Sequence, residues 1–221
     1  MNCNEINWLE LKGSHFFNAD CMEVMSTMPD KLADLAICDP PYGNNLSGGR
    51  SAKNGWNNNI DWDKCNKGWN LNIPTKEYFI ELQRVSKNQI IWGGNYFANL
   101  LPSSECWLVW DKGQRDFSLA DGEMAWTSFD KAMRIHTLHR AVANRETKIH
   151  PTQKPVALYE WILNKYAKKG DKILDTHGGS MSIAIAAWNL GFDLTLCELD
   201  KDYFEAGKKR IEFHQAQKRL F

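Results

Sequence analysis

Residues 33–43 read ADLAICDPPYG, an apolar run that ends abruptly in an acid, two prolines and a tyrosine. The apolar run has the composition of a buried strand. Proline fixes φ and lacks an N–H group, so neither Pro40 nor Pro41 can continue a strand ladder or enter a helix interior. The residue before a proline is also disfavoured in the α region. The sequence therefore predicts a strand that ends in a rigid corner, with Asp39 held in it and Tyr42 just beyond.

Length and composition indicate an ordinary folded domain. The chain has 221 residues, of which 43% are apolar and 24% are charged, and this length predicts a single domain over residues 1–221. The formal net charge is zero, so overall charge favours no class of partner. The six cysteines include no CxxC pair, which indicates reduced core thiols. No signal pattern or membrane-length apolar run is present, so we expect a cytoplasmic protein without a membrane partner.

Short apolar runs alternate with segments of helical periodicity. The expected strands lie at residues 16–20, 33–39, 88–93, 106–111, 123–129, 133–139, 172–176 and 193–199. The expected helices lie at residues 77–86, 155–166, 181–190 and 202–215, and Met22, Met25 and Met28, spaced every three residues, indicate a further helix. Strands that alternate with helices, and strand runs without polar alternation, favour a sheet covered on both faces. We therefore predict an α/β fold with a doubly wound, mostly parallel sheet.

One long segment has little periodicity. Residues 43–72 are rich in Asn, Gly and Trp and begin directly after the proline corner. An irregular stretch of this length inside a compact domain is usually functional or mobile. We expect a lid or a substrate-contacting loop here, and a disordered insertion is the alternative.

Polar and glycine-rich motifs follow several of the expected strands. DPPY follows the strand at 33–39, GGN begins at Gly93, THGGSMS follows the strand at 172–176, and Glu198 closes the last strand. Ligands of open parallel sheets bind outside the carboxyl ends of the strands. We therefore expect these motifs to share one crevice.

The segment at residues 172–190 has the strand, glycine turn and helix of a nucleotide site, and Glu198 follows at the position that accepts ribose hydroxyls. The turn is neither GxGxxG nor GxxxxGK[ST], which disfavours a dinucleotide and a nucleoside triphosphate. An adenosine ligand without a pyrophosphate fits better, and an ordinary strand-to-helix turn is the alternative.

Together the motifs resemble those of the amino-group DNA methyltransferases that use S-adenosylmethionine. DPPY (39–42) matches their catalytic motif, ILDTHGGS (173–180) resembles their cofactor loop, and HPTQKPVAL (150–158) is similar to the motif that leads into the preceding helix. The opening NADCMEVMSTMPDKLADLAICDPPY (18–42) also resembles the family's. The catalytic motif precedes the cofactor loop, as in the permuted β group. The resemblance spans residues 14–212 and implies a Rossmann-like, S-adenosylmethionine-dependent methyltransferase fold.

The resemblance also implies what the proline corner does. The Asp39 carboxylate and the backbone C=O of Pro40 would accept the two hydrogens of an exocyclic amine, and the rigid corner would aim both acceptors at that amine. Tyr42 would stack on a base that has left the duplex. The implied catalytic residues are therefore Asp39, Pro40 and Tyr42.

The resemblance further implies residues for S-adenosylmethionine and for double-stranded DNA. The expected cofactor residues are Asp20, Cys21, Asp39, Lys154, Asp175, His177, Gly178, Gly179, Ser180 and Glu198. Residues 131–154 contain six Lys or Arg and one acid, which suits a polyanion, and residues 131–150 are the expected recognition segment. The expected DNA contacts are Arg50, Trp56, Arg134, Arg140, Arg145 and Lys148. We expect no metal site, because His136 and His139 fall on opposite faces of a strand.

Several alternatives stay open. The aspartate of DPPY favours the N6 amino group of adenine, and cytosine N4 or RNA is the alternative target. His177 stands where the family's loop has an aromatic residue. Met181 replaces a glycine of that loop and adds bulk there, so a silent, nucleic-acid-binding methyltransferase fold is a further alternative. The short chain leaves little room for a recognition domain, which leaves open a homodimer. No nuclease motif is visible, so a restriction–modification role would be limited to protective methylation.

Overall fold

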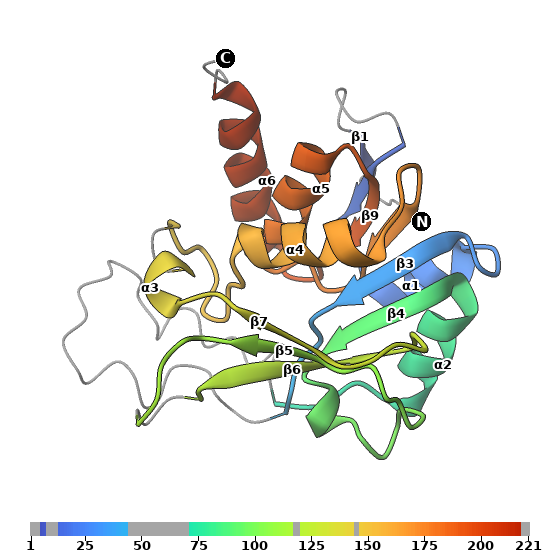
Figure 1. Ribbon diagram of the computed structural model, residues 1–221. Coiled ribbons are helices and arrows are strands. Elements are labelled where there is room, and N and C mark those ends of the chain that lie inside the picture. The colour runs from blue at the N-terminus through green and yellow to red at the C-terminus, as the bar shows by residue number, and fades with distance from the viewer. Residues whose placement is uncertain (1–4, 8–12, 44–70, 117–119, 144–145, 218–221) are drawn as a thin grey trace.

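A computed structural model describes residues 5–7, 13–43, 71–116, 120–143 and 146–217 (Figure 1). Within these ranges nine strands form one sheet, in the order β1-β2-β9-β8-β3-β4-β6-β5-β7. The strands are β1 (Glu5–Asn7), β2 (His15–Phe17), β3 (Ala33–Cys38), β4 (Ser86–Trp92), β5 (Leu108–Asp111), β6 (Gly122–Thr127), β7 (Arg134–Thr137), β8 (Lys172–Asp175) and β9 (Asp193–Cys197). The helices are α1 (Cys21–Thr27), α2 (Lys76–Val85), the 3-10 turn η1 (Gly94–Tyr96), α3 (Arg140–Ala143), α4 (Val156–Tyr166), α5 (Ser182–Leu190) and α6 (Lys201–Ala216).

Most neighbouring strands run in the same direction. Strands β2, β9, β8, β3 and β4 are parallel, and β6 is antiparallel to both β4 and β5. Strand β7 pairs in parallel with β5, so its carboxyl end lies at the same edge as those of β3 and β4. The predicted α/β fold with a mostly parallel sheet is confirmed. The carboxyl ends of these strands form one edge of the sheet, which we call the carboxyl edge, and the opposite one is the amino edge.

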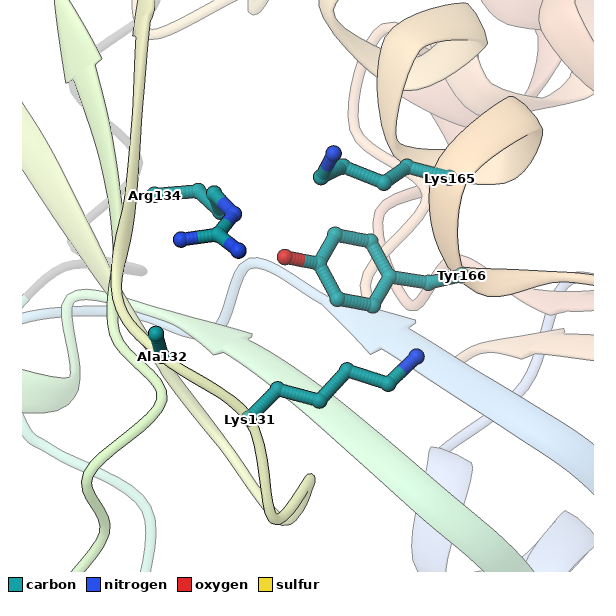
Figure 2. A pocket seen from close by; sticks show the side chains of 5 residues that line it. All are labelled: Lys131, Ala132, Arg134, Lys165 and Tyr166. Carbon is teal, nitrogen blue, oxygen red and sulfur yellow. The ribbon is translucent and has the colours of Figure 1, made fainter.

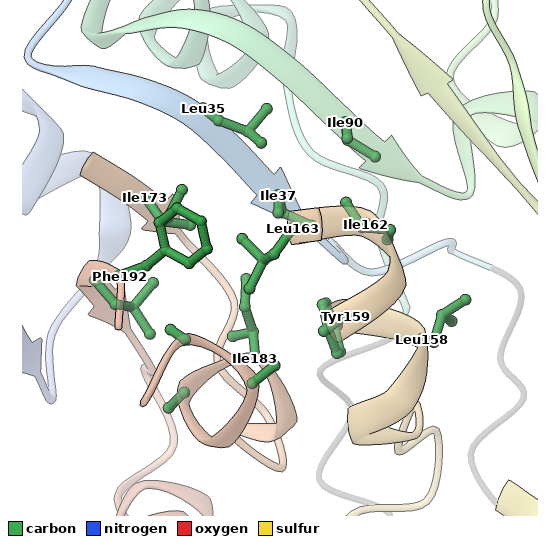
Figure 3. Close-up of a cluster of buried hydrophobic side chains, with 14 of the residues drawn as sticks. Leu35, Ile37, Ile90, Leu158, Tyr159, Ile162, Leu163, Ile173, Ile183 and Phe192 are labelled. Carbon is green, nitrogen blue, oxygen red and sulfur yellow. The ribbon is translucent and has the colours of Figure 1, made fainter. Parts of the chain in front are cut away.

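Helices cover both faces of the sheet, because successive strand residues point to opposite faces. In β3, Leu35 and Ile37 belong to the apolar cluster that includes α4 and α5, whereas Ala36 and Cys38 belong to the cluster that includes α1 and α2. Figure 3 shows the first cluster, where side chains of β3, β4 and β8 meet those of α4 and α5. The sheet is therefore the middle of three layers, which fixes the strand ends relative to one another.

Two helices begin at acids that follow a strand. The Asp20 carboxylate accepts the N–H of Met22 at 2.7 Å and caps α1, and the Asp200 carboxylate accepts the N–H groups of Asp202 and Tyr203 at 2.9 and 3.1 Å and caps α6. Caps of this kind satisfy N–H groups that have no partner within the helix. Both helices therefore start at the carboxyl edge.

The expected strands and helices are all present, with ends that differ by a few residues. Strand β2 ends at Phe17 because residues 18–20 already lead into the α1 cap. The sequence prediction lacked β1, η1 and α3, which are too short to show periodicity. Most of the expected loop at 43–72 lies outside the described residues, and so do its Arg50 and Trp56. Arg145 also lies outside them. No helix in the described part of the chain has the length and apolar character of a membrane span.

Candidate active site

A cavity of about 660 Å³ lies at the carboxyl edge, at the ends of β3, β8 and β9. All but one of the expected cofactor residues line it: Asp20, Cys21, Asp39, Lys154, His177, Gly178, Gly179, Ser180 and Glu198. The exception is Asp175, which is buried at the end of β8 and does not reach the cavity surface. Five separate stretches of sequence therefore meet where the pattern of strand ends predicts one crevice.

The glycine loop after β8 is held by the acid that follows β9. The Glu198 carboxylate accepts the N–H of Gly179 at 2.6 Å with one oxygen and that of Asp200 at 2.8 Å with the other. Burial raises the pKa of Glu198, although these backbone N–H groups oppose the shift. A carboxylate has about four lone-pair sites, so Glu198 can accept further hydrogen bonds from a ligand's hydroxyl groups.

The methionine in the glycine loop points away from the cavity. Met181 has a left-handed backbone conformation, with φ 55° and ψ 30°, which explains why a glycine suits this position. Its side chain is fully buried in the core and does not line the cavity. It packs against α6, where a Cβ added to Gly207 would lie 2.6 Å from the Met181 Cγ. The bulk of Met181 therefore lies in the core, where Gly207 leaves space for it.

Burial shifts the pKa values of two neighbours in this loop. It lowers the pKa of His177 to about 4, so the imidazole is neutral at pH 7, and the ring shares a hydrogen bond of 2.9 Å with the Thr176 hydroxyl. Burial raises the pKa of Asp175 to about 8, with Asp39 and Glu198 adding to the rise. The loop is thus built on a histidine and an aspartic acid that are mostly uncharged at neutral pH.

The proline corner presents a carboxylate whose two oxygens are both engaged. One Asp39 oxygen accepts the Tyr42 hydroxyl at 2.5 Å, and the other accepts the Lys154 ammonium at 2.5 Å. Lys154 also donates to the Tyr42 hydroxyl at 3.1 Å. Lys154 was expected among the cofactor residues, and the structure places its ammonium on the Asp39 carboxylate.

The ammonium of Lys154 bridges Asp39 to a second carboxylate. It lies 3.1 Å from Glu123 of β6, and Glu123 in turn pairs with Lys112 at 2.6 Å. Burial alone would lower the pKa of Lys154, but Asp39 and Glu123 outweigh it and hold this pKa above its usual value. Burial alone would raise the pKa of Glu123, but Lys154 and Lys112 lower it to about 2. Both groups of this bridge are therefore charged at neutral pH.

The sequence prediction missed Glu123 and Lys112. Each belongs to no motif, and Glu123 stands near the start of a strand rather than at its end. The antiparallel direction of β6 brings that start to the carboxyl edge. The alternation of apolar residues carries no signal of strand direction, so the sequence could not place Glu123 at the site.

The ring of Tyr42 is packed rather than open to the cavity. It stacks on Tyr96 of η1, with ring centroids 4.9 Å apart and planes at 13°. Gly93 has φ 71°, and a Cβ there would lie 2.2 Å from Tyr42, so only glycine leaves room for the ring. Neither Tyr42 nor the buried Pro40 lines the cavity. The GGN motif therefore supports the proline corner, and Tyr96, which the sequence prediction missed, covers one face of Tyr42.

The expected DNA-contacting residues that the structure describes lie at different edges of the sheet. Lys148 is two residues before His150, which lines the cavity. Arg134 is the first residue of β7 and so lies at the amino edge. Figure 2 shows it with Lys131, facing Lys165 and Tyr166 of α4 across a cavity of about 300 Å³. For Arg140 the structure describes only the backbone position, as the first residue of α3. The basic stretch therefore does not form one continuous surface beside Asp39 and Tyr42.

Comparison with known proteins agrees with the fold. The chain is 24% identical to the Type II methyltransferase M.HinfI of Haemophilus influenzae over a gapped alignment of 238 positions, which covers 87% of this chain and 66% of M.HinfI. This chain therefore spans just under two thirds of the length of that relative.

Two solved structures share the fold. The M1.HpyAVI–SAM complex has a TM-score of 0.57 and 20% identity, over 89% of this chain and 98% of the other. The cytosine-N4-specific PvuII DNA methyltransferase has a TM-score of 0.59 and 12% identity, over 90% of this chain and 86% of the other. The model of the family described as DNA methylase matches residues 76–209, from α2 through the glycine loop and into α6. This match covers more than half of the sequence, so the chain belongs to the DNA methylase family.

Proposed function

We propose that the protein transfers a methyl group from S-adenosylmethionine to the N6 amino group of adenine in double-stranded DNA. The observation that carries the proposal is a single cavity lined by both Asp39 of the proline corner and the glycine loop at Gly178 and Gly179. A donor held at the loop and an amine held at the corner would meet across one space.

The cavity suits S-adenosylmethionine in size and charge. Its volume of about 660 Å³ lies within the range of small-molecule sites. Asp20, Asp39, Glu198 and Asp200 line it, against the cations of Lys154 and Lys201, so the surface favours a ligand with positive charge. Bound there, S-adenosylmethionine would supply a methyl group on a positively charged sulfonium.

The residues that line the cavity include groups for each part of that molecule. Glu198 would accept the ribose hydroxyls, because its oxygens keep lone pairs after binding the loop. Asp20 and Cys21 would lie against the adenine. Asp39 of the proline corner, which lines the same cavity, would face the methyl group.

The aspartate would activate a poor nucleophile. The lone pair of an exocyclic amine is delocalised into the base, so acceptors for both amino hydrogens would help it to localise on nitrogen. The Asp39 carboxylate and the Pro40 carbonyl would be those acceptors. As the new nitrogen–carbon bond forms and the sulfur–carbon bond breaks, positive charge develops on the nitrogen, and Asp39 would stabilise this charge and accept the proton that the nitrogen loses.

The target base is the finer part of the proposal. The aspartate in DPPY supports adenine. The second candidate is the N4 amino group of cytosine, the target named for the PvuII enzyme with which this chain shares its fold.

Purified protein should be incubated with labelled S-adenosylmethionine and unmethylated double-stranded DNA, with RNA in a parallel sample, and the product nucleosides separated. We expect label in N6-methyladenine. Label in N4-methylcytosine would move the target to cytosine, and no label together with no cofactor binding would favour a silent binding protein.

The other sequence predictions stay proposals. We propose that residues 43–72 form a lid or DNA-contacting loop and that residues 131–150 contribute to recognition. A homodimer would supply a second recognition surface to a short chain. Light scattering during size-exclusion chromatography, with and without DNA, would measure the oligomeric state.

A further inference from the structure

We infer that Glu123 is a positioning residue for methyl transfer. Glu123 holds Lys154 and offsets its positive charge, so that the negative charge of the Asp39 carboxylate still acts on the amine. The inference rests on the proposed function and adds to it a residue outside all the sequence motifs.

Four side chains of alternating charge follow one another through the site. Lys112 lies 2.6 Å from one oxygen of Glu123, and Lys154 lies 3.1 Å from the other. Lys154 then reaches Asp39 at 2.5 Å. The four come from different parts of the chain, after β5, in β6, before α4 and after β3. The sheet therefore assembles a charge chain that ends at the catalytic carboxylate.

The positive charge of Lys154 would disfavour the reaction, and the negative charge of Glu123 offsets it. The Lys154 side chain is only 2% exposed, so water screens it little. Alone beside Asp39, its ammonium would cancel the negative charge of the carboxylate and oppose the positive charge that develops on the amine. With Glu123 charged, the two carboxylates balance the ammonium groups of Lys112 and Lys154, and without that charge the four groups would carry a net positive charge beside the amine.

Lys154 is also held in place from several sides. It donates to the Tyr42 hydroxyl at 3.1 Å and lies over the ring of Trp92, 5.2 Å from its centroid. These contacts keep the ammonium near Asp39 even when Glu123 is neutral. Removing the charge of Glu123 should therefore change the electrostatics of the site more than its shape.

The first test is Glu123→Gln, which keeps the size of the side chain and removes its charge. We expect kcat for methyl transfer to fall by about 10- to 100-fold, while KM for S-adenosylmethionine and for DNA changes by less than about 3-fold. Circular dichroism and thermal melting would confirm that the variant is folded. Full kcat in the folded variant would overturn the inference.

The second test separates charge offset from simple support. In the double variant Glu123→Gln/Lys154→Met the uncompensated ammonium is also gone, so Asp39 regains its negative charge, and the Tyr42 hydroxyl still holds one of its oxygens. We expect kcat of the double variant to exceed that of Glu123→Gln by at least about 5-fold. If Glu123 were only a structural partner, the double variant would be no better than the single one, and that result would overturn the charge argument.

A matched control removes a carboxylate charge elsewhere. Glu81 on α2 pairs with Arg84 at 2.7 Å and does not line the cavity. The variant Glu81→Gln should keep the wild-type kcat. A wild-type protein without methyl transfer would overturn the proposed function together with this inference, whereas an active wild type with an equally active Glu123→Gln would overturn this inference alone.

Discussion

Asp39 carries the largest share of the proposed chemistry among the single residues of this protein. Both of its oxygens already accept hydrogen bonds, from Tyr42 and from Lys154, so its position is fixed before any substrate binds. Such preorganisation is the main way in which a carboxylate lowers the barrier for a reaction that develops charge.

The first prediction removes the charge of this aspartate. The Asp39→Asn variant keeps the shape of the side chain but cannot stabilise a cationic amine, so kcat should fall by at least about 1,000-fold with the fold intact. Asp111→Asn is a matched control, because Asp111 also ends a strand at the carboxyl edge but pairs with Arg115 and does not line the cavity. Full activity of the folded Asp39→Asn variant would refute the mechanism.

The second prediction concerns stability and pH at Asp175. Burial raises its pKa from 3.8 to about 8, so the folded protein binds this proton more tightly than the unfolded chain. Stability therefore falls as pH rises from about 4 to about 8, and the full cost of the buried charge is present above pH 8. The Asp175→Asn variant cannot ionise, and its amide oxygen can still accept the His177 N–H, which lies 3.0 Å from the carboxylate.

Melting temperatures of wild type and Asp175→Asn should therefore be compared from pH 5 to pH 9. We expect the variant to melt at least about 5 °C higher at pH 9, with an advantage that shrinks steadily toward pH 5. The neutral histidines His150 and His177, whose pKa burial lowers to about 4, titrate in both proteins and cancel in the difference. A difference that did not change with pH would show that Asp175 is not a buried proton-binding group.

At the scale of elements, the contact between α6 and the start of α5 explains how a methionine fits into the glycine loop. A Cβ on Gly207 would lie 2.6 Å from the Met181 Cγ and 2.7 Å from its sulfur. In a helix interior without such a contact, Gly→Ala stabilises by about 1 kcal/mol. Here the same change should have the opposite sign.

The third prediction is that Gly207→Ala lowers the free energy of unfolding by about 1–3 kcal/mol, because the side chain of Met181 has no space to move into. Urea unfolding would measure the change. In the double variant Met181→Ala/Gly207→Ala the clashing atoms are gone, so its destabilisation should be smaller than the sum of the two single changes by at least about 1 kcal/mol. A stabilised Gly207→Ala protein would show that the two helices do not pack in this way.

The helices and strands also differ in how far the sequence could predict them and the place of the residues they carry. The unit of β8, glycine turn and α5 was predictable, because an apolar run, two glycines and a helical repeat each indicate one of its parts. The cavity followed from the rule that ligands meet at carboxyl ends of parallel strands. Glu123 was not predictable, because its place depends on β6 running antiparallel to β4, and tertiary pairing alone decides that direction.

Tyr96 illustrates a second limit of prediction. It follows the GGN motif directly, and the left-handed Gly93 turns the chain so that the ring of Tyr96 stacks on Tyr42. The motif itself was visible in the sequence, but a stack between residues more than fifty positions apart depends on how β3 and β4 lie side by side. Local sequence patterns identify the glycines but do not show which aromatic ring packs against them.

At the scale of the whole molecule, the two edges of the sheet differ in what they offer to DNA. In the proposed reaction the target amine must reach Asp39, so the duplex would approach the carboxyl edge. Helix α4 starts at that edge, where the Glu146 carboxylate accepts the N–H of Val156 at 2.9 Å, and ends at Tyr166 beside the basic cavity of the amino edge. Lys148 lies in the sequence between Glu146 and His150, and His150 lines the cavity at the carboxyl edge. Arg134, in contrast, lies at the amino edge.

The last prediction follows from this separation. Each phosphate contact contributes about 0.9 to the slope of log K against log salt for duplex DNA. Lys148→Ala should therefore weaken binding of a short duplex and reduce the magnitude of the slope by about 1, with the same effect on every sequence. Arg134→Ala is the matched control, and its slope should stay that of the wild type, because a short duplex seated over Asp39 does not extend to the amino edge. Equal losses in the two variants would mean that DNA also contacts the amino edge, since a basic side chain can lower the slope only where a phosphate comes near it.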